Sequence, residues 1–168
     1  SPGYQIGGDR ISLKLEENDE KLIKELSKFN KNLVVVYVGG SAIDMNNWQD
    51  KVPSILFSWY SGMEGGKALA KILYGDINPS GKLPFSIPKN ISDYPYFNPF
   101  TDTITYGYYH GYTLFEKFGK EISYPFGFGL SYSKFHYKNL IVSELNISDS
   151  TYQISFDIEN ISNYNGKE

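Results

Sequence analysis

Apolar residues recur at helical spacing over residues 17–29, where they share one face of the segment. The positions on that face are Leu22, Ile23, Leu26 and Phe29. The pattern predicts an amphipathic helix, with Asn18 or Asp19 as its N-cap.

A continuous apolar run follows at residues 33–38, and residues 54–59 form a second, mostly apolar segment that contains Ser54 and Ser58. An uninterrupted β-branched run such as 33–38 is typical of a strand covered on both faces of a parallel sheet, and residues 54–59 are interpreted as a second buried strand. A short helical crossover is expected at residues 42–48. A second helix follows the second run, and Gly75 stands where a left-handed C-terminal cap is expected. The apolar positions of this helix are Met63, Ala68, Leu69, Ile72 and Leu73. The order of elements predicts a layered α/β sandwich with a mostly parallel sheet.

The pattern changes at about residue 76, where prolines interrupt every regular element and tyrosines and phenylalanines accumulate. We expect a long, packed, irregular excursion there. Strict alternation returns at residues 152–158, as in a half-exposed antiparallel strand. Two or three strands are marginal alone, so residues from 135 onward are interpreted as the start of an antiparallel β-sandwich.

Composition narrows the classes of function. With 16 basic and 19 acidic residues, the net charge is −3 and no long run of one sign occurs, which argues against nucleic acid and membrane surfaces as partners. The chain has no cysteine, so thiolate metal sites and cysteine nucleophiles are excluded. The cellular compartment stays open, and because the chain opens at Ser1 without a methionine, truncation is an expectation.

Aromatic residues are the compositional outlier. They make up 17% of the chain and crowd into residues 94–137. Any single tyrosine is more often a wedge between core and surface, with its hydroxyl in water. The functional alternative is that these rings stack on the C–H faces of sugars.

Two long segments carry a family resemblance. Residues 78–88, here called the Asn-Pro segment, read Asn-Pro-Ser-Gly-Lys-Leu-Pro-Phe-Ser-Ile-Pro and follow a Gly-Met-Glu-Gly-Gly sequence at 62–66. Residues 124–135, here called the Tyr-Pro segment, read Tyr-Pro-Phe-Gly-Phe-Gly-Leu-Ser-Tyr-Ser-Lys-Phe. Together they resemble the hallmarks of glycoside hydrolase family 3. A third segment, 109–115, resembles the family's Val-Gly-Tyr-Arg-Tyr-Tyr, but Thr113 replaces its arginine and Tyr106 the usual upstream glutamate.

The resemblance implies a domain organisation and an activity. Residues 1–134 would form the family's C-terminal α/β sandwich domain, and residues 135–168 the beginning of its fibronectin type III-like domain. The parent protein would be a retaining β-glycosidase acting on β-glucosides or β-xylosides, with no cofactor. The partners of this chain would be that substrate and an N-terminal barrel domain. The 168-residue chain would be inactive alone.

The catalytic carboxyl groups of the family are not found in this sequence at their usual positions. A retaining glycosidase needs two carboxyl groups about 5 Å apart. The family's nucleophile is a barrel aspartate in a Ser-Asp-Trp context, and these 168 residues contain no such triplet. Ile6 stands where the family commonly has its acid/base glutamate. Either the proton donor precedes Ser1, or the barrel supplies it, or this member of the family is impaired in catalysis, and we favour the first. Asp9 and Arg10 are the candidate substrate-binding residues, either orienting the active-site loop or forming an ordinary ion pair.

Other polar residues carry less functional signal. Glu64 lies at a helix start, where its charge is favoured structurally. His110 and His136 are isolated in the sequence, so we expect no metal site. The acceptor pattern Asn-x-Ser occurs three times and is short enough to arise by chance. These occurrences begin at Asn90, Asn146 and Asn160.

Two other classes of function remain. The strand before Gly39 and Gly40 suggests a nucleotide- or phosphate-binding α/β domain, but no Walker lysine or three-glycine fingerprint follows. The stronger rival is a non-catalytic carbohydrate-binding or structural module that uses the aromatic region.

Overall fold

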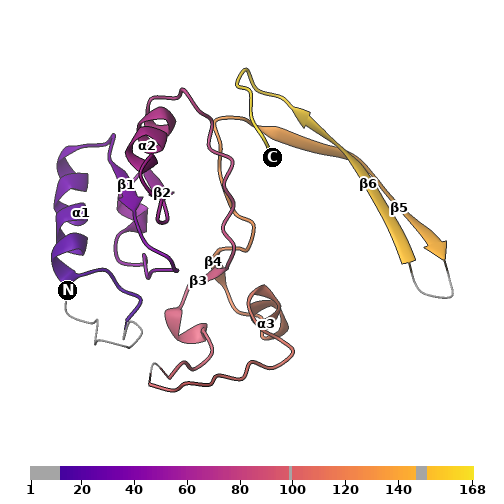
Figure 1. Cartoon of the computed structure of the whole chain (residues 1–168), viewed down its shortest axis with the longest axis horizontal. Coiled ribbons are helices and arrows are strands. Elements are labelled where there is room, and N and C mark those ends of the chain that lie inside the picture. The colour runs from indigo at the N-terminus through magenta and orange to yellow at the C-terminus, as the bar shows by residue number, and fades with distance from the viewer. Residues whose placement is uncertain (1–11, 99, 147–150) are drawn as a thin grey trace. The chain divides into compact units, whose positions relative to one another are not determined.

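The computed structural model of this chain describes residues 12–98, 100–146 and 151–168. Contacts divide the chain into two compact units, the first within Ser1–Gly66 and Leu83–Phe128 and the second within Lys67–Lys82 and Gly129–Glu168. Figure 1 colours the elements in chain order. They are α1 (Glu17–Phe29), β1 (Val34–Tyr37), η1 (Gln49–Lys51), β2 (Ser54–Phe57), α2 (Gly65–Leu73), β3 (Ile87–Pro88), η2 (Ile91–Asp93), α3 (Tyr112–Lys117), β4 (Ile122–Tyr124), β5 (Phe135–Asn146) and β6 (Thr151–Asn160).

Helix α1 has the bounds that helical spacing predicted, Glu17–Phe29. Its N-cap is Glu16, so the prediction of Asn18 or Asp19 as the cap was wrong. The backbone N–H groups of Asp19 and Glu20 both donate to the Glu16 carbonyl, which places the helix start earlier. Acidic side chains in the first turn complement the positive end of the helix dipole.

Strands β1 and β2 form a parallel pair in the first unit, as the apolar runs predicted. The register runs from Val34 opposite Ser54 to Tyr37 opposite Phe57. Each strand is shorter than the segment predicted for it. The last three residues of each strand are half-buried rather than fully covered.

The predicted helix at residues 42–48 is absent, and that prediction was wrong. Asp44 forms an isolated parallel bridge with Lys14, and its N–H donates to the Leu13 carbonyl at 2.8 Å. The Asp44 carboxylate then accepts from the Asn46 N–H at 3.1 Å, which begins a turn. A tertiary partner and a side-chain turn therefore replace the intrahelical hydrogen bonds.

This non-helical segment supplies most of the core of the first unit. Trp48 and Ile43 have no exposed surface, and Met45 and Ile87 are almost completely buried. Half-buried residues of α1, β1, β2 and the Asn-Pro segment pack around them.

The excursion after residue 76 contains more regular structure than we expected. β3 pairs antiparallel with β4, so that Ile87 lies opposite Tyr124. The Asn90 side chain accepts from the Ser92 N–H and caps η2. Helix α3 begins after Gly111, which has a positive φ of 57°.

The second unit contains most of α2 and the antiparallel pair β5–β6. Gly75 has a φ of 82°, so the predicted left-handed conformation after α2 is confirmed. Met63 precedes α2 and is fully exposed. The predicted strand 152–158 lies within β6, every residue of which is exposed.

The fold is mixed α/β, with one parallel strand pair and two antiparallel pairs among the described residues. None of the described helices combines the length and the apolar character that crossing a bilayer requires.

Candidate functional site

The predicted substrate-binding residues Asp9 and Arg10 lie outside the described residues, as does Ile6. Their roles therefore stay predictions. Glu64 is exposed directly before the first residue of α2, as expected for a charge at a helix start. His110 is exposed in the first unit, and His136 lies opposite Glu159 in the β5–β6 pair of the second. Within the described ranges, no group of three His, Cys, Asp or Glu residues is placed to hold a metal ion.

In the first unit, the end of the Asn-Pro segment contacts the beginning of the Tyr-Pro segment. The Leu83 N–H donates to the Phe128 carbonyl, and the Gly127 N–H donates back to the Leu83 carbonyl, both at 2.8 Å. The Phe126 N–H donates to the buried Ser86 Oγ at 3.0 Å. Together with the pairing of β3 and β4, these bonds join two stretches about 40 residues apart.

In the second unit, Asn78 binds the other end of the Tyr-Pro segment. Its amide nitrogen donates to Ser133 Oγ at 2.7 Å and to the Asn165 carbonyl at 2.9 Å. Its amide oxygen accepts from the Tyr132 N–H at 2.8 Å. The buried Ser133 hydroxyl donates onward to the Tyr164 carbonyl at 2.8 Å, so both polar groups are satisfied.

Lys82 adds a charged contact in the same unit. Its Nζ donates to the Gly129 carbonyl at 3.1 Å and lies 3.3 Å from Glu168 Oε1. The Tyr137 hydroxyl donates to the same carboxylate oxygen at 2.6 Å. These contacts, the Tyr137 bond first, lower the pKa of Glu168 and favour its ionised form. Both ends of the Asn-Pro segment thus serve as structural contacts.

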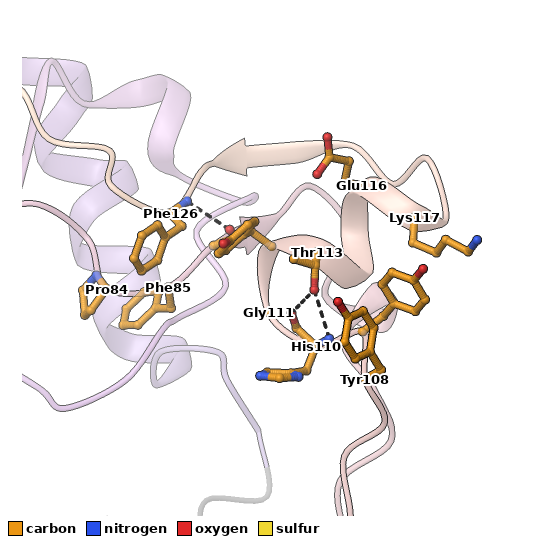
Figure 2. A pocket seen from close by; sticks show the side chains of 12 residues that line it. Pro84, Phe85, Tyr108, His110, Gly111, Thr113, Glu116, Lys117 and Phe126 are labelled. Atoms are coloured by element: carbon orange, nitrogen blue, oxygen red, sulfur yellow. Dashed lines mark hydrogen bonds between the residues drawn. The ribbon is translucent and has the colours of Figure 1, made fainter. Parts of the chain in front are cut away.

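A pocket opens in the first unit between the Asn-Pro segment and α3, shown in Figure 2. We call it the tyrosine pocket. Its volume is about 750 Å³, within the range of small-molecule sites. Residues 84–86, 108–113, 116, 117 and 126 line it. Tyr108 is 89% exposed, and Tyr109, Tyr112 and Phe126 are each about half exposed.

Local hydrogen bonds hold the loop that carries these tyrosines. The Thr113 hydroxyl donates to the His110 carbonyl at 2.7 Å and accepts from the His110 N–H at 3.2 Å, as the dashed lines in Figure 2 indicate. The ring Nδ1 of His110 lies 3.2 Å from the Gly107 carbonyl. The left-handed conformation of Gly111 turns the chain into α3. Thr113 thus anchors this loop.

The tyrosine pocket lacks the groups of a retaining glycosidase. Of the described residues that line it, Glu116 is the single carboxylate, whereas the mechanism needs two about 5 Å apart. The pocket can therefore bind a ligand through aromatic faces, hydroxyls and one carboxylate, but it does not contain the catalytic pair.

The described residues form a mixed α/β fold in which the Asn-Pro segment and the Tyr-Pro segment are hydrogen-bonded to each other. Comparison with known proteins identifies the family. The model for the glycosyl hydrolase family 3 C-terminal domain matches residues 4–132, so the chain belongs to this family. A β-glucosidase of Bacteroides ovatus is 39% identical over 96% of this chain. Thermostable β-glucosidase B of Acetivibrio thermocellus is 38% identical over 96% of it. The crystal structure of a family 3 β-glucosidase of Bifidobacterium adolescentis aligns with a TM-score of 0.82 and 34% identity over 92% of this chain.

The chain spans less than a quarter of each of these relatives. It covers 23% of the Bacteroides protein, 22% of the Acetivibrio protein and 23% of the Bifidobacterium chain. Most of the length of each relative therefore has no counterpart in these 168 residues.

Sequence reasoning did not find the tyrosine pocket as a site. It noted the aromatic crowding in residues 94–137 but gave no reason to group Tyr108 and Tyr112 with Phe126. The similarity of residues 109–115 to a family segment pointed to residues that line the pocket, but it gave no indication that they form a cavity.

Proposed function

We propose that this chain is part of a retaining β-glycosidase that hydrolyses the O-glycosidic bonds of β-glucosides or β-xylosides. In that enzyme it supplies scaffold and active-site-loop surface, and it is inactive alone. The observation that carries the proposal is the family match over residues 4–132. The names of the relatives, which are β-glucosidases, support a β-glucoside as substrate.

The proposed division of labour follows from the mechanism. Cleavage with retention requires a nucleophilic carboxylate and an acid/base carboxyl group close together in space. The chain has no Ser-Asp-Trp triplet, and Ile6 occupies the common acid/base position. The nucleophile is therefore assigned to the barrel, and the acid/base carboxyl group is assigned to the sequence before Ser1. The rest of the parent enzyme completes the site.

Within that enzyme, Asp9 and Arg10 are proposed to bind substrate or to orient the loop that does. A carboxylate and a guanidinium form a strong, directional pair that can also hydrogen-bond sugar hydroxyls. In the longer protein, Arg10→Lys keeps the charge but loses the planar fork. We expect it to raise KM, and an unchanged KM and kcat would remove Arg10 from the site.

We also propose a layered α/β sandwich domain over residues 1–134, followed by the beginning of a fibronectin type III-like domain over 135–168. The parallel pair β1–β2, which α1 precedes and α2 follows along the chain, is consistent with the first. The second is supported by the start of β5 at Phe135, three residues after the end of the family match, and by apolar side chains along the exposed β6. A two-stranded ribbon of this kind needs further strands for independent stability.

The test is the complete reading frame and its product. We expect a barrel with a Ser-Asp-Trp nucleophile to be encoded before residue 1, and the complete protein to hydrolyse an aryl β-glucoside or β-xyloside with retention. A reading frame without such a barrel, or a complete protein inert toward both substrates, would reject the proposal.

A further inference from the structure

We propose that the tyrosine pocket is a binding site for β-linked sugar rings. The proposal rests on the proposed function for its class of ligand, β-glucosides or β-xylosides. Its other support is the geometry of the pocket. Because Glu116 is the single carboxylate among the described residues that line it, the pocket by itself would hold carbohydrate without cleaving it.

The aromatic rings present two pairs of surfaces to the pocket. The rings of Tyr108 and Tyr109 are 5.1 Å apart and perpendicular. The rings of Tyr112 and Phe126 are 5.3 Å apart with 33° between their planes. All four are substantially exposed. Exposed aromatic faces in a concavity attract ligands that have an apolar face and a polar rim, and a β-linked pyranose has both.

Polar groups beside these rings have unused hydrogen-bonding capacity. Within the described chain, the hydroxyls of Tyr108, Tyr109 and Tyr112 make no hydrogen bond, and the Glu116 carboxylate has neither a hydrogen bond nor an ion pair. Lys117 Nζ lies 5.2 Å from the centre of the Tyr109 ring and adds a cation at the edge. Hydroxyls and a carboxylate are the donors and acceptors that sugar hydroxyls need.

The pocket walls are fixed before any ligand arrives. Thr113 holds the turn at His110, and Ser86 Oγ holds the backbone at Phe126. Tyr112 is part of α3, whose Phe115 is almost completely buried and packs edge-on against Tyr94 at 5.7 Å. Pre-organised walls lower the entropic cost of binding a small ligand.

A titration of the complete protein tests the site, after a fluorinated β-glucoside has blocked its catalytic centre. Methyl β-glucoside, methyl β-xyloside and cellotriose are added while saturation transfer from the protein to the sugar protons is followed by NMR. We expect saturable transfer, with a Kd on the order of 1 mM for the monosaccharides, as for a small ligand on an open site, and tighter binding of cellotriose.

Variants then locate the binding. Because Tyr108 is 89% exposed, Tyr108→Ala should leave the melting temperature unchanged and loosen binding roughly 3- to 10-fold. Glu116→Gln, which keeps the size but not the charge, should also loosen it. The matched control is Tyr60→Ala, since Tyr60 belongs to the same unit, is 76% exposed and does not line the pocket. Its binding should equal that of the unaltered chain.

Three results would overturn the proposal. The first is no saturable transfer to any of the sugars. The second is equal weakening by Tyr108→Ala and Tyr60→Ala. The third is a Tyr108→Ala change that destabilises the longer protein without altering sugar binding, which would make the pocket an interface with another part of that protein. Loss of hydrolysis by the longer protein tests the proposed function instead, so the two failures are distinguishable.

Discussion

The side-chain oxygen of Asn78 accepts a 2.8 Å hydrogen bond from the backbone N–H of Tyr132, 54 residues later in the chain. With the two bonds that its amide nitrogen donates to Ser133 and Asn165, Asn78 joins three stretches of the second unit. The segments that identify the family are therefore contacts of the scaffold.

Asn78→Asp tests this role, because the aspartate has nearly the same shape but cannot donate. We expect the free energy of unfolding to fall by about 1–3 kcal/mol, since Ser133 and the Asn165 carbonyl lose their donor. Urea denaturation measures it. The control Asn18→Asp, at an exposed position in the first turn of α1, should be neutral or slightly stabilising. Equal effects of the two substitutions would argue against the role.

Alanine substitutions at Gly75 and Gly66 test the effect of backbone conformation, since the two sites differ in φ. A Cβ at either position would meet no atom within 4 Å, but only Gly75 has a positive φ, of 82°. Gly75→Ala should therefore destabilise the protein by about 1 kcal/mol, whereas Gly66→Ala, inside α2, should stabilise it by up to about 1 kcal/mol. Thermal unfolding of both variants gives the comparison, and shifts in the same direction would contradict it.

We expect the ionisation of Tyr94 to lower the stability of the fold at alkaline pH. Burial raises the pKa of its phenol from 10.0 to about 12. The folded chain holds this proton more tightly than the unfolded chain, so the contribution to stability is complete below pH 10 and is lost as the pH rises toward about 12.

Tyr94→Phe removes the ionisable group and should flatten the fall in unfolding free energy over that interval. It should also lower stability at neutral pH by about 1 kcal/mol, because the Ser86 carbonyl loses its 2.7 Å donor. Denaturant titrations at several pH values show both effects. Tyr96→Phe, at an exposed position, should leave the fall of unfolding free energy with pH unchanged. If Tyr94→Phe shows the same fall as Tyr96→Phe, Tyr94 is not the group responsible.

The core of the first unit depends on a segment without helix or strand. Ile43 has no exposed surface, so Ile43→Ala should cost about 2–5 kcal/mol. Leu22→Ala, at a position that is 57% exposed, should cost far less. The two midpoints in urea test the difference, and similar midpoints would mean that residues 42–48 are not the core.

Local pattern predicted the elements whose stability is local. Helix α1 was predicted to the residue from the spacing of its apolar face, and Gly75 from its position after α2. The helix predicted at residues 42–48 failed because Asp44 finds a backbone partner at Leu13, which no periodicity reveals. The N-cap prediction failed because Glu16 caps α1 through its backbone carbonyl alone.

The candidate site was less accessible to sequence reasoning. The contacts of Asn78 with Tyr132 and Ser133 join residues more than 50 positions apart, and the tyrosine pocket is assembled from three separate stretches. Aromatic crowding indicated a functional region without showing which rings share a cavity. Asp9 and Arg10 stay predictions.

We propose that the nucleophile of the parent enzyme lies outside these 168 residues. A fluorinated β-glucoside that forms a long-lived glycosyl-enzyme marks the nucleophile covalently, and peptide mass spectrometry of the labelled complete protein locates it. We expect the label on an aspartate of a peptide outside residues 1–168. A label on any Asp or Glu within residues 1–168 would contradict the account.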